Sequence, residues 1–250
     1  MSEPISVDVV LPCYNEISIL RSSVERTLQF FDTAPQYKWH IVIADNGSTD
    51  RTDELARTLA VENEQVSVIA IPQKGRGHAL HQAWTTSSAD IVTYMDVDLS
   101  TRIEHLLDLV QLIAHSNCEV AIGTRLSKQS KTKRSLKREI TSRGYVFLIR
   151  LFFPSLSITD AQCGFKALKR TTAERIVPKI KNREWFFDTE LLIISEKNGF
   201  KVCEIPVNWT DDPDTRVKIF RTAWDDIKGL LRIRFGGLAA SRKTLSAKSC

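Results

Sequence analysis

The sequence predicts an α/β fold, a mostly parallel sheet flanked by helices. The first observation is that apolar runs of strand length alternate with segments of helical period through the first half of the chain. The second is that polar residues follow these runs, as expected where parallel strands end beside a ligand. The third is the composition: 250 residues, 42% hydrophobic and 26% charged, are enough for a sizeable core.

Short apolar runs are the expected strands of the sheet. They are ISVDVVL (5–11), HIVIA (40–44), VSVIAI (66–71), DIVTYM (90–95) and VAIG (120–123). The helical period between them predicts helices over 16–31, 50–63, 76–87 and 102–115. Strands that alternate with helices are typical of a parallel sheet wrapped by helices.

After residue 124 the alternation is less regular. We expect a basic segment, a helix over 136–151, a turn-rich stretch TDAQCGFKALKR (159–170), a helix around 185–199, a strand VCEIPVNW (202–209) and an amphipathic helix within 216–235. Because no internal repeat or low-complexity linker interrupts the chain, we expect a single domain over 1–235 and a flexible tail over 236–250.

Charge and cysteine content restrict the class of protein. The formal charge is +5, and the basic residues are concentrated between 127 and 143, which suggests an anionic partner. The five cysteines are scattered and contain no CxxC pair, so we expect neither a disulfide framework nor a zinc site, and a reducing compartment. No signal peptide is visible, and the apolar runs are shorter than the roughly 20 residues of a spanning helix, so we expect a protein that does not cross a membrane.

The motif DVDLST contains two carboxylates where a buried strand ends. Burying the charge of Asp96 or Asp98 costs on the order of several kcal/mol each, unless a cation neutralises it. Oxygen ligands from both acids, completed by Ser100, suit a hard divalent ion bound together with a diphosphate. The alternative is that Ser100 or its neighbour caps the following helix, which would explain Asp98 but not Asp96.

Two other loops predict a nucleotide site. Asp45 ends a strand, where an acid accepts hydrogen bonds from a ribose or a base. In QKGRGHAL the glycines permit close approach of the backbone, and Lys74 and Arg76 supply positive charge before a helix, which suits phosphate. Each loop alone is equally consistent with a solvated turn and a capped helix.

Taken in order, these segments resemble one family: the inverting family 2 glycosyltransferases of the Rossmann-like GT-A fold, and within it the polyprenyl-phosphate sugar synthases of the dolichyl-phosphate mannose synthase or β-glucosyltransferase type. The resemblance covers about residues 5–235. It rests on VVLPCYNE, ADNGSTDRT, KGRGHAL, DVDLST, IGTR, TDAQCGFKALKR, FDTELL and EIPVNW. Two positions depart from the family: Asn46 stands where members often have Asp, and Ser100 where mannose synthases commonly have Gln.

The resemblance implies metal-dependent, inverting transfer of a hexose from GDP-mannose or UDP-glucose to polyprenyl or dolichyl phosphate. Residues 1–124 would form the nucleotide-sugar half and 125–235 the acceptor half. Around the nucleoside it places Pro12, Tyr14, Glu16 and Asp45. It assigns Asp96 to the ribose and diphosphate and, with Asp98, to Mg²⁺ or Mn²⁺.

An anionic acceptor calls for cations rather than a protein base, because a phosphate oxygen is already ionised at neutral pH. The candidates are Arg125, Arg138, Arg143, Arg216 and Lys218, with Asp160 and Gln162 in the acceptor-side loop. We therefore predict Asp96, Asp98 and Arg125 as the catalytic residues. Two alternatives remain: transfer to a hydroxyl acceptor with Asp188 as general base, and a nucleotide- or nucleic-acid-binding module using 127–143. The latter lacks interleaved aromatic residues, so we expect no nucleic acid partner.

The segment 216–235 predicts how such a protein reaches a lipid. Apolar residues at helical spacing form one stripe: Val217, Phe220, Trp224, Ile227 and Leu231. The stripe is equally consistent with packing on the sheet and with an interfacial helix on anionic lipid. The second alternative predicts a peripheral protein at the cytoplasmic face of a membrane, with or without a membrane anchor subunit.

Overall fold

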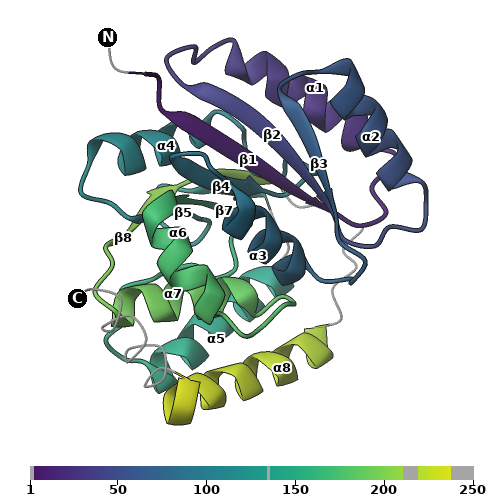
Figure 1. Cartoon of the computed structure of the whole chain (residues 1–250). Helices are drawn as coiled ribbons and strands as arrows, with labels where there is room; N and C mark the ends of the chain where they lie inside the picture. Colours follow the sequence, from purple (N-terminus) through teal and green to yellow (C-terminus); the bar gives the residue numbers. More distant parts are fainter. Residues whose placement is uncertain (1–2, 134–135, 211–218, 238–250) are drawn as a thin grey trace.

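The computed structural model describes residues 3–133, 136–210 and 219–237. At the centre of this part of the chain lies a seven-stranded sheet (Figure 1). Its order is β3-β2-β1-β4-β7-β5-β8, and β7 is antiparallel to β4 and β5 while the other pairs are parallel. The strands are β1 (Ser6–Cys13), β2 (Lys38–Asp45), β3 (Val66–Ala70), β4 (Ile91–Met95), β5 (Val120–Thr124), β7 (Phe165–Lys169) and β8 (Val202–Pro206). The predicted fold class is confirmed.

Helices cover both faces of the sheet, and a separate hydrophobic core fills each side. One core joins the sheet to α1 (Leu20–Phe31), α2 (Thr52–Glu62) and α4 (His105–His115). The other joins it to α3 (Arg76–Thr86), α5 (Leu136–Phe152), α6 (Arg170–Ile176), α7 (Phe187–Lys197) and α8 (Ile219–Arg232). Short helical turns η1 (Val177–Lys179) and η2 (Ile233–Gly237) extend α6 and α8.

Sheet topology places the predicted loops together. Strand β1 lies between β2 and β4 and is parallel to both, so their carboxyl ends meet at one edge. Cys13 pairs in register with Asp45, and β4 ends at Met95, one residue before Asp96. The order along the sheet reverses at β1, which is where ligands bind in open α/β sheets.

The acceptor half differs from the prediction in its strands. The stretch expected to be turn-rich contains β7, and VCEIPVNW divides into β8 and β9 (Asn208–Thr210), which pairs with β6 (Lys131–Lys133). Strand β7 escaped the pattern because its second residue, Lys166, interrupts the apolar run, yet Lys166 is fully buried. Only its tertiary partners explain a lysine in a central strand.

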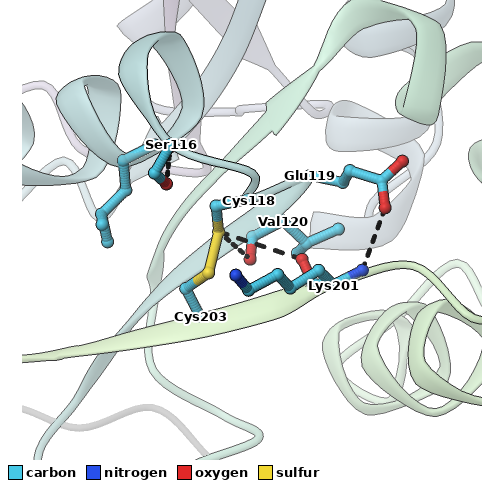
Figure 2. The surroundings of a disulfide bond; sticks show 7 residues. Ser116, Cys118, Glu119, Val120, Lys201 and Cys203 are labelled. Atoms are coloured by element: carbon cyan, nitrogen blue, oxygen red, sulfur yellow. Dashed lines mark hydrogen bonds between the residues drawn. A yellow bond between two sulfur atoms is a disulfide. The ribbon is translucent and has the colours of Figure 1, made fainter.

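The expectation of no disulfide is wrong. Within the described residues, Cys118 and Cys203 form a disulfide with a Cα–Cα distance of 6.1 Å, and it links the segment just before β5 to β8 (Figure 2). Spacing did not reveal it because 85 residues separate the two cysteines and only the pairing of β5 with β8 brings them together. The disulfide removes the basis for expecting a reducing compartment from cysteine usage.

The last helix, α8, buries a different face from the stripe in its sequence. Trp224 and Leu231 of that stripe are exposed, whereas Leu230 and Ile233 are buried. Val217, Arg216 and Lys218 lie outside the described residues, as does the expected tail beyond residue 237. Among the described helices, none combines the length and apolar character needed to cross a bilayer.

Candidate active site

Asp45 presents an open carboxylate oxygen at the carboxyl edge of the sheet. It is the last residue of β2 and only 4% exposed. Its Oδ2 accepts a hydrogen bond from the Ser48 amide at 3.3 Å, while Oδ1 is buried without a hydrogen-bond partner. Since an unsatisfied buried acceptor costs about 1–3 kcal/mol, this oxygen is suited to a donor group from a ligand.

The loops around Asp45 hold one another closely. Asn46 Oδ1 accepts a hydrogen bond from the Gly75 amide at 3.4 Å, which joins the end of β2 to the QKGRG loop. Gly47 has φ +78°, and a Cβ there would lie 2.9 Å from the Pro72 carbonyl oxygen. The amide at position 46 thus serves loop geometry.

A cation lies over an aromatic ring beside these loops. The Lys74 ammonium is 3.7 Å from the centre of the Tyr14 ring, so the two predicted donor-site residues are brought together. The Glu16 backbone amide donates to the Thr52 hydroxyl at 2.9 Å, which ties the segment after β1 to the start of α2. Pro12 lies in β1, paired in register with Ala44.

Asp96 is held by Arg76, which lies at the start of α3. Arg76 Nη2 donates to Asp96 Oδ1 at 2.6 Å, and its guanidinium also lies over the rings of Tyr94 and Trp185. Partial burial raises the pKa of the Asp96 carboxyl above its ordinary value; Arg76 opposes this shift and Asp98 adds to it. The Asp96 carboxylate therefore interacts with Arg76 and remains close enough to the sheet edge to interact with a charged ligand as well.

Gly164 explains the QCGF motif next to this pair. A Cβ at Gly164 would lie 2.0 Å from Asp96 Oδ2 and 2.4 Å from Arg76 Nη2. The Asp96 amide also donates to the Gly164 carbonyl at 3.2 Å. Only a glycine allows the acid and the arginine to lie directly on this loop.

Asp98 is the exposed acid of the pair. Its Oδ1 accepts a hydrogen bond from the Ser100 amide at 2.9 Å, and the intervening Leu99 has φ +52°. Among the described residues, no cluster of three or more His, Cys, Asp or Glu side chains could hold a metal ion. Two carboxylates with ligand phosphates are nevertheless a usual Mg²⁺ site, so Asp96 and Asp98 fit a divalent cation that shares a diphosphate.

Asp188 is committed to a buried network. It is 2% exposed; Lys166 Nζ lies 2.7 Å from its Oδ1, and the Tyr94 hydroxyl donates to the same oxygen. Arg76 Nε lies 3.8 Å from its Oδ2. A carboxylate with these partners is a poor general base, which argues against the hydroxyl-acceptor alternative.

Arg125 and Asp160 form a paired group at the end of β5. Arg125 Nε and Nη2 donate to the two Asp160 oxygens at 2.7 and 2.9 Å, and the guanidinium lies 5.5 Å from the Trp209 ring centre. Burial raises the pKa of Asp160, but the Arg125 charge and hydrogen bonds outweigh it and hold the pKa below its ordinary value. Asp160 therefore fixes the orientation of Arg125.

Gln162 connects the acceptor-side loop to α8. Its amide nitrogen donates to Asp226 Oδ2 at 3.3 Å, and Asp226 is 3% exposed. Burial raises the pKa of Asp226 to about 7. The sequence offered no sign of this, because Asp226 reads as one of two solvated acids on a basic helix.

The remaining predicted residues are more dispersed. Arg143 lies on the exposed face of α5 and pairs with Glu139. The backbone of Arg138 belongs to α5, but its side chain, like Arg216 and Lys218, lies outside the described residues. Sequence analysis missed the pairing of Arg76 with Asp96, for which the KGRG motif was the available signal, and a buried ion pair of Glu190 with Arg232, for which there was none.

Comparison with known proteins places this geometry in a family. Residues 8–177 match the family model described as Glycosyl transferase family 2. Glycosyltransferase AglD of Haloferax volcanii is 35% identical over 228 residues, 90% of this chain and 36% of that protein, so the chain spans about a third of this relative's length. The dolichyl-phosphate beta-glucosyltransferase of Saccharomyces cerevisiae is 29% identical over 94% of this chain and 76% of its own.

Solved structures share the fold. Glucosyl-3-phosphoglycerate synthase of Mycobacterium tuberculosis, in complex with Mn²⁺, uridine diphosphate and phosphoglyceric acid, has a TM-score of 0.66 at 18% identity, over 93% of this chain and 79% of that chain. The family model covers more than half of the chain, and the predicted resemblance is confirmed. The chain therefore belongs to Glycosyl transferase family 2.

Proposed function

We propose that the chain transfers glucose, with inversion, from a nucleotide sugar to polyprenyl or dolichyl phosphate. The observation that carries this proposal is the sheet edge where the open oxygen of Asp45 and the exposed acid Asp98 lie beside the Arg76–Asp96 pair. The names of several relatives, dolichyl-phosphate beta-glucosyltransferases, support glucose over mannose and a lipid phosphate as acceptor. In this proposal residues 1–235 act as one domain with a donor half, 1–124, and an acceptor half, 125–235.

The reaction needs no proton acceptor on the protein. An anionic phosphate oxygen attacks the anomeric carbon, the bond from that carbon to the diphosphate oxygen breaks, and the diphosphate leaves with the electron pair. The protein has to bring two anions together and orient them, which is work for Arg125, Arg76 and Lys74. The commitment of Asp188 to Lys166 and Tyr94 agrees with a reaction that uses no general base.

Asp96 and Asp98, with Ser100, would hold Mg²⁺ or Mn²⁺ in this proposal. When bound, the ion would offset the charge that develops on the leaving diphosphate. Asp45, Tyr14, Glu16 and Pro12 would surround the nucleoside.

Arg125 would position the acceptor phosphate, held in place by Asp160. Arg125→Ala should raise the KM for lipid acceptor or lower kcat while nucleotide affinity, measured by calorimetry without acceptor, stays near wild type. Equal loss of nucleotide affinity would assign Arg125 to the donor side instead. Arg138, Arg143, Arg216 and Lys218 are further acceptor-side candidates.

We also propose that α5 and α8 form the face that meets the membrane. Six of the nine large apolar side chains that are exposed within the described residues lie on these helices and η2. They are Ile140, Phe147 and Leu151 on α5, and Trp224, Leu231 and Phe235 on α8 and η2. The two helices pack against each other (Figure 1). In each set the residues recur at intervals of seven and four, so each set lies on one side of its helix.

Basic residues accompany this apolar face. Arg143, Arg150, Lys228 and Arg234 are exposed on the same elements, and each charge near an anionic bilayer contributes about 1 kcal/mol. Vesicles containing anionic lipid should therefore sediment the protein at low salt and release it at high salt. Substituting Phe147 and Trp224 by Ser should abolish sedimentation, whereas Val61→Ser, at an exposed apolar site on α2, should not. Binding that requires another protein would point to an anchor subunit.

The cytoplasmic face is part of the same proposal. It predicts that Cys118 and Cys203 are reduced in the cell, because cytosolic thiol systems open most disulfides. Alkylation of intact cells before lysis, followed by mass spectrometry, measures their state. If Cys118 and Cys203 escape alkylation because they are joined in a disulfide, the protein lies in an oxidising compartment.

A transfer assay tests the reaction itself. UDP-glucose and GDP-mannose are each offered with polyprenyl phosphate, and with Mg²⁺ or Mn²⁺. We expect glucosyl phospholipid from UDP-glucose only, and none without the ion. Transfer to a hydroxyl-bearing acceptor in place of the phosphate, or retention of a nucleic acid without any transfer, would favour one of the two alternatives.

A further inference from the structure

Glu190 lies at the junction of three segments that the reaction described above does not connect. It is on α7, 1% exposed, and Arg232, the last residue of α8, donates to both its oxygens at 2.8 and 2.7 Å. The same two oxygens accept the backbone amides of Lys181 and Asn182 at 3.2 and 2.9 Å. One carboxylate thus holds both the end of α8 and the loop 180–186.

That loop rests on the QKGRG loop of the donor half. The Arg183 carbonyl accepts a hydrogen bond from the His78 amide at 3.0 Å. A Cβ at Gly75 or Gly77 would lie 2.6 Å from the Arg183 carbonyl oxygen or carbon, so the two backbones are in direct contact. Trp185, from the same loop, lies under the Arg76 guanidinium at 5.2 Å.

Arg76 is the residue between these glycines, and it carries the contact to Asp96. A shift of the loop 180–186 therefore changes the position of Arg76, because the contacts of Gly75 and Gly77 with the Arg183 backbone leave no space between the two loops. A buried carboxylate that accepts four hydrogen bonds is held rigidly. Two of the four come from the Arg232 guanidinium, and removing it leaves the Glu190 charge buried without a cation.

We propose that Glu190 is a positioning residue that couples the placement of α8 to the geometry of the donor loop through Arg232. The end of α8, one of the two helices of the proposed membrane face, thereby sets the affinity of the QKGRG loop for a nucleoside diphosphate. This inference rests on the proposed donor site at residues 74–77.

A matched pair of variants separates coupling from a general loss of stability. Arg21 and Glu62 form a similar two-bond ion pair, at 2.8 and 3.2 Å, between α1 and α2, and both residues are exposed. Arg232→Met should weaken the binding of uridine diphosphate with Mn²⁺, measured by calorimetry without lipid, by five- to tenfold. Arg21→Met should leave it unchanged, and Arg232→Lys, which keeps the charge, should recover part of the loss.

Hydrogen exchange provides the readout that a merely local role would not move. In Arg232→Met we expect faster exchange in peptides covering 180–186 and also in those covering 75–80. Faster exchange in 180–186 alone, or unchanged nucleotide affinity, overturns the proposal. If Arg232→Met does not fold, the same two measurements on Arg232→Lys decide it. If the wild-type chain binds no nucleotide, the proposed donor site fails, and the exchange result alone decides the coupling.

Discussion

The donor half and the acceptor half of the molecule use their acids differently. In the donor half, Asp45 keeps an oxygen without a protein partner and Asp98 is exposed. In the acceptor half, Asp160, Asp188 and Glu190 are buried, and each is paired with a cation of the chain: Arg125, Lys166 and Arg232. Asp96, paired with Arg76, lies between these extremes.

The difference shows what each half is prepared for. A buried acid without a cation is costly, so it either keeps its proton, as Asp226 does below about pH 7, or marks a place where a ligand supplies the missing partner. An acid already paired inside the protein fixes a cation or a loop instead. The acceptor is itself an anion in the proposed reaction, so the useful groups there are the cations that those acids hold in place.

Removing the cation partner of a buried acid should have a larger effect than any other change described below. Lys166→Met leaves Asp188 buried without its ammonium partner, so the free energy of unfolding should fall by about 3–5 kcal/mol. Denaturant titration measures this loss. Arg51→Met, which removes an exposed pair with Glu54, should cost less than about 1 kcal/mol. Similar losses in both variants would contradict a structural role specific to the buried pair.

The next effect concerns an open acid. Asp98→Asn should lower turnover at least tenfold, because it removes charge from the proposed cation site while keeping the shape. Its Tm should stay close to wild type, since Asp98 is exposed. Steady-state kinetics and a thermal melt test both halves of this statement. Wild-type enzyme that remains fully active in EDTA would remove the metal from the proposal.

Asp45→Asn should have opposite effects on stability and on nucleotide binding. The variant replaces a buried carboxylate that has one unpartnered oxygen, so its Tm should match or exceed that of wild type. Its affinity for the nucleotide should fall about tenfold, since a hydrogen bond to a charged group contributes about 1.5–3 kcal/mol. Calorimetry measures the affinity and a thermal melt measures the Tm. A drop in both quantities would show that Asp45 stabilises the fold rather than serving the ligand alone.

The smallest effect is pH-dependent and concerns Asp226, which faces Gln162 and Tyr145 and has Asp225 as its neighbour. Burial raises the pKa of Asp226 to about 7, so the folded state retains a proton that the unfolded state loses near pH 4. Wild-type stability should therefore fall as pH rises between about 4 and 7, and then level off. Asp226→Asn should raise Tm by about 2–4 °C at pH 8 and by less at pH 5. An equal change at both pH values would show that the carboxyl is ionised throughout.

Local sequence pattern was sufficient to predict the donor half. Each strand there is an apolar run, each strand end is polar, and parallel strands bring those ends to one edge, so local pattern was enough to predict that Asp45, Asp96 and Asp98 share an edge. The family resemblance followed from the same loops, because their spacing along the chain reflects the order of the strands. Pairing within the edge was not predicted, and Arg76 with Asp96 is the clearest case.

The acceptor half depends on contacts between distant segments, and these became visible in the folded molecule. Lys166 interrupts the apolar run of a central strand, so that strand was not predicted. Cys118 pairs with Cys203 across 85 residues, and Glu190 pairs with an arginine 42 residues away on another helix. The exposed face of α8 was also a tertiary outcome, since one helix carries apolar residues on both its buried and its solvent side. Periodicity reports which residues are apolar along a helix or strand, but the partner of a buried charge or thiol is chosen by contacts between distant segments, which no local pattern contains.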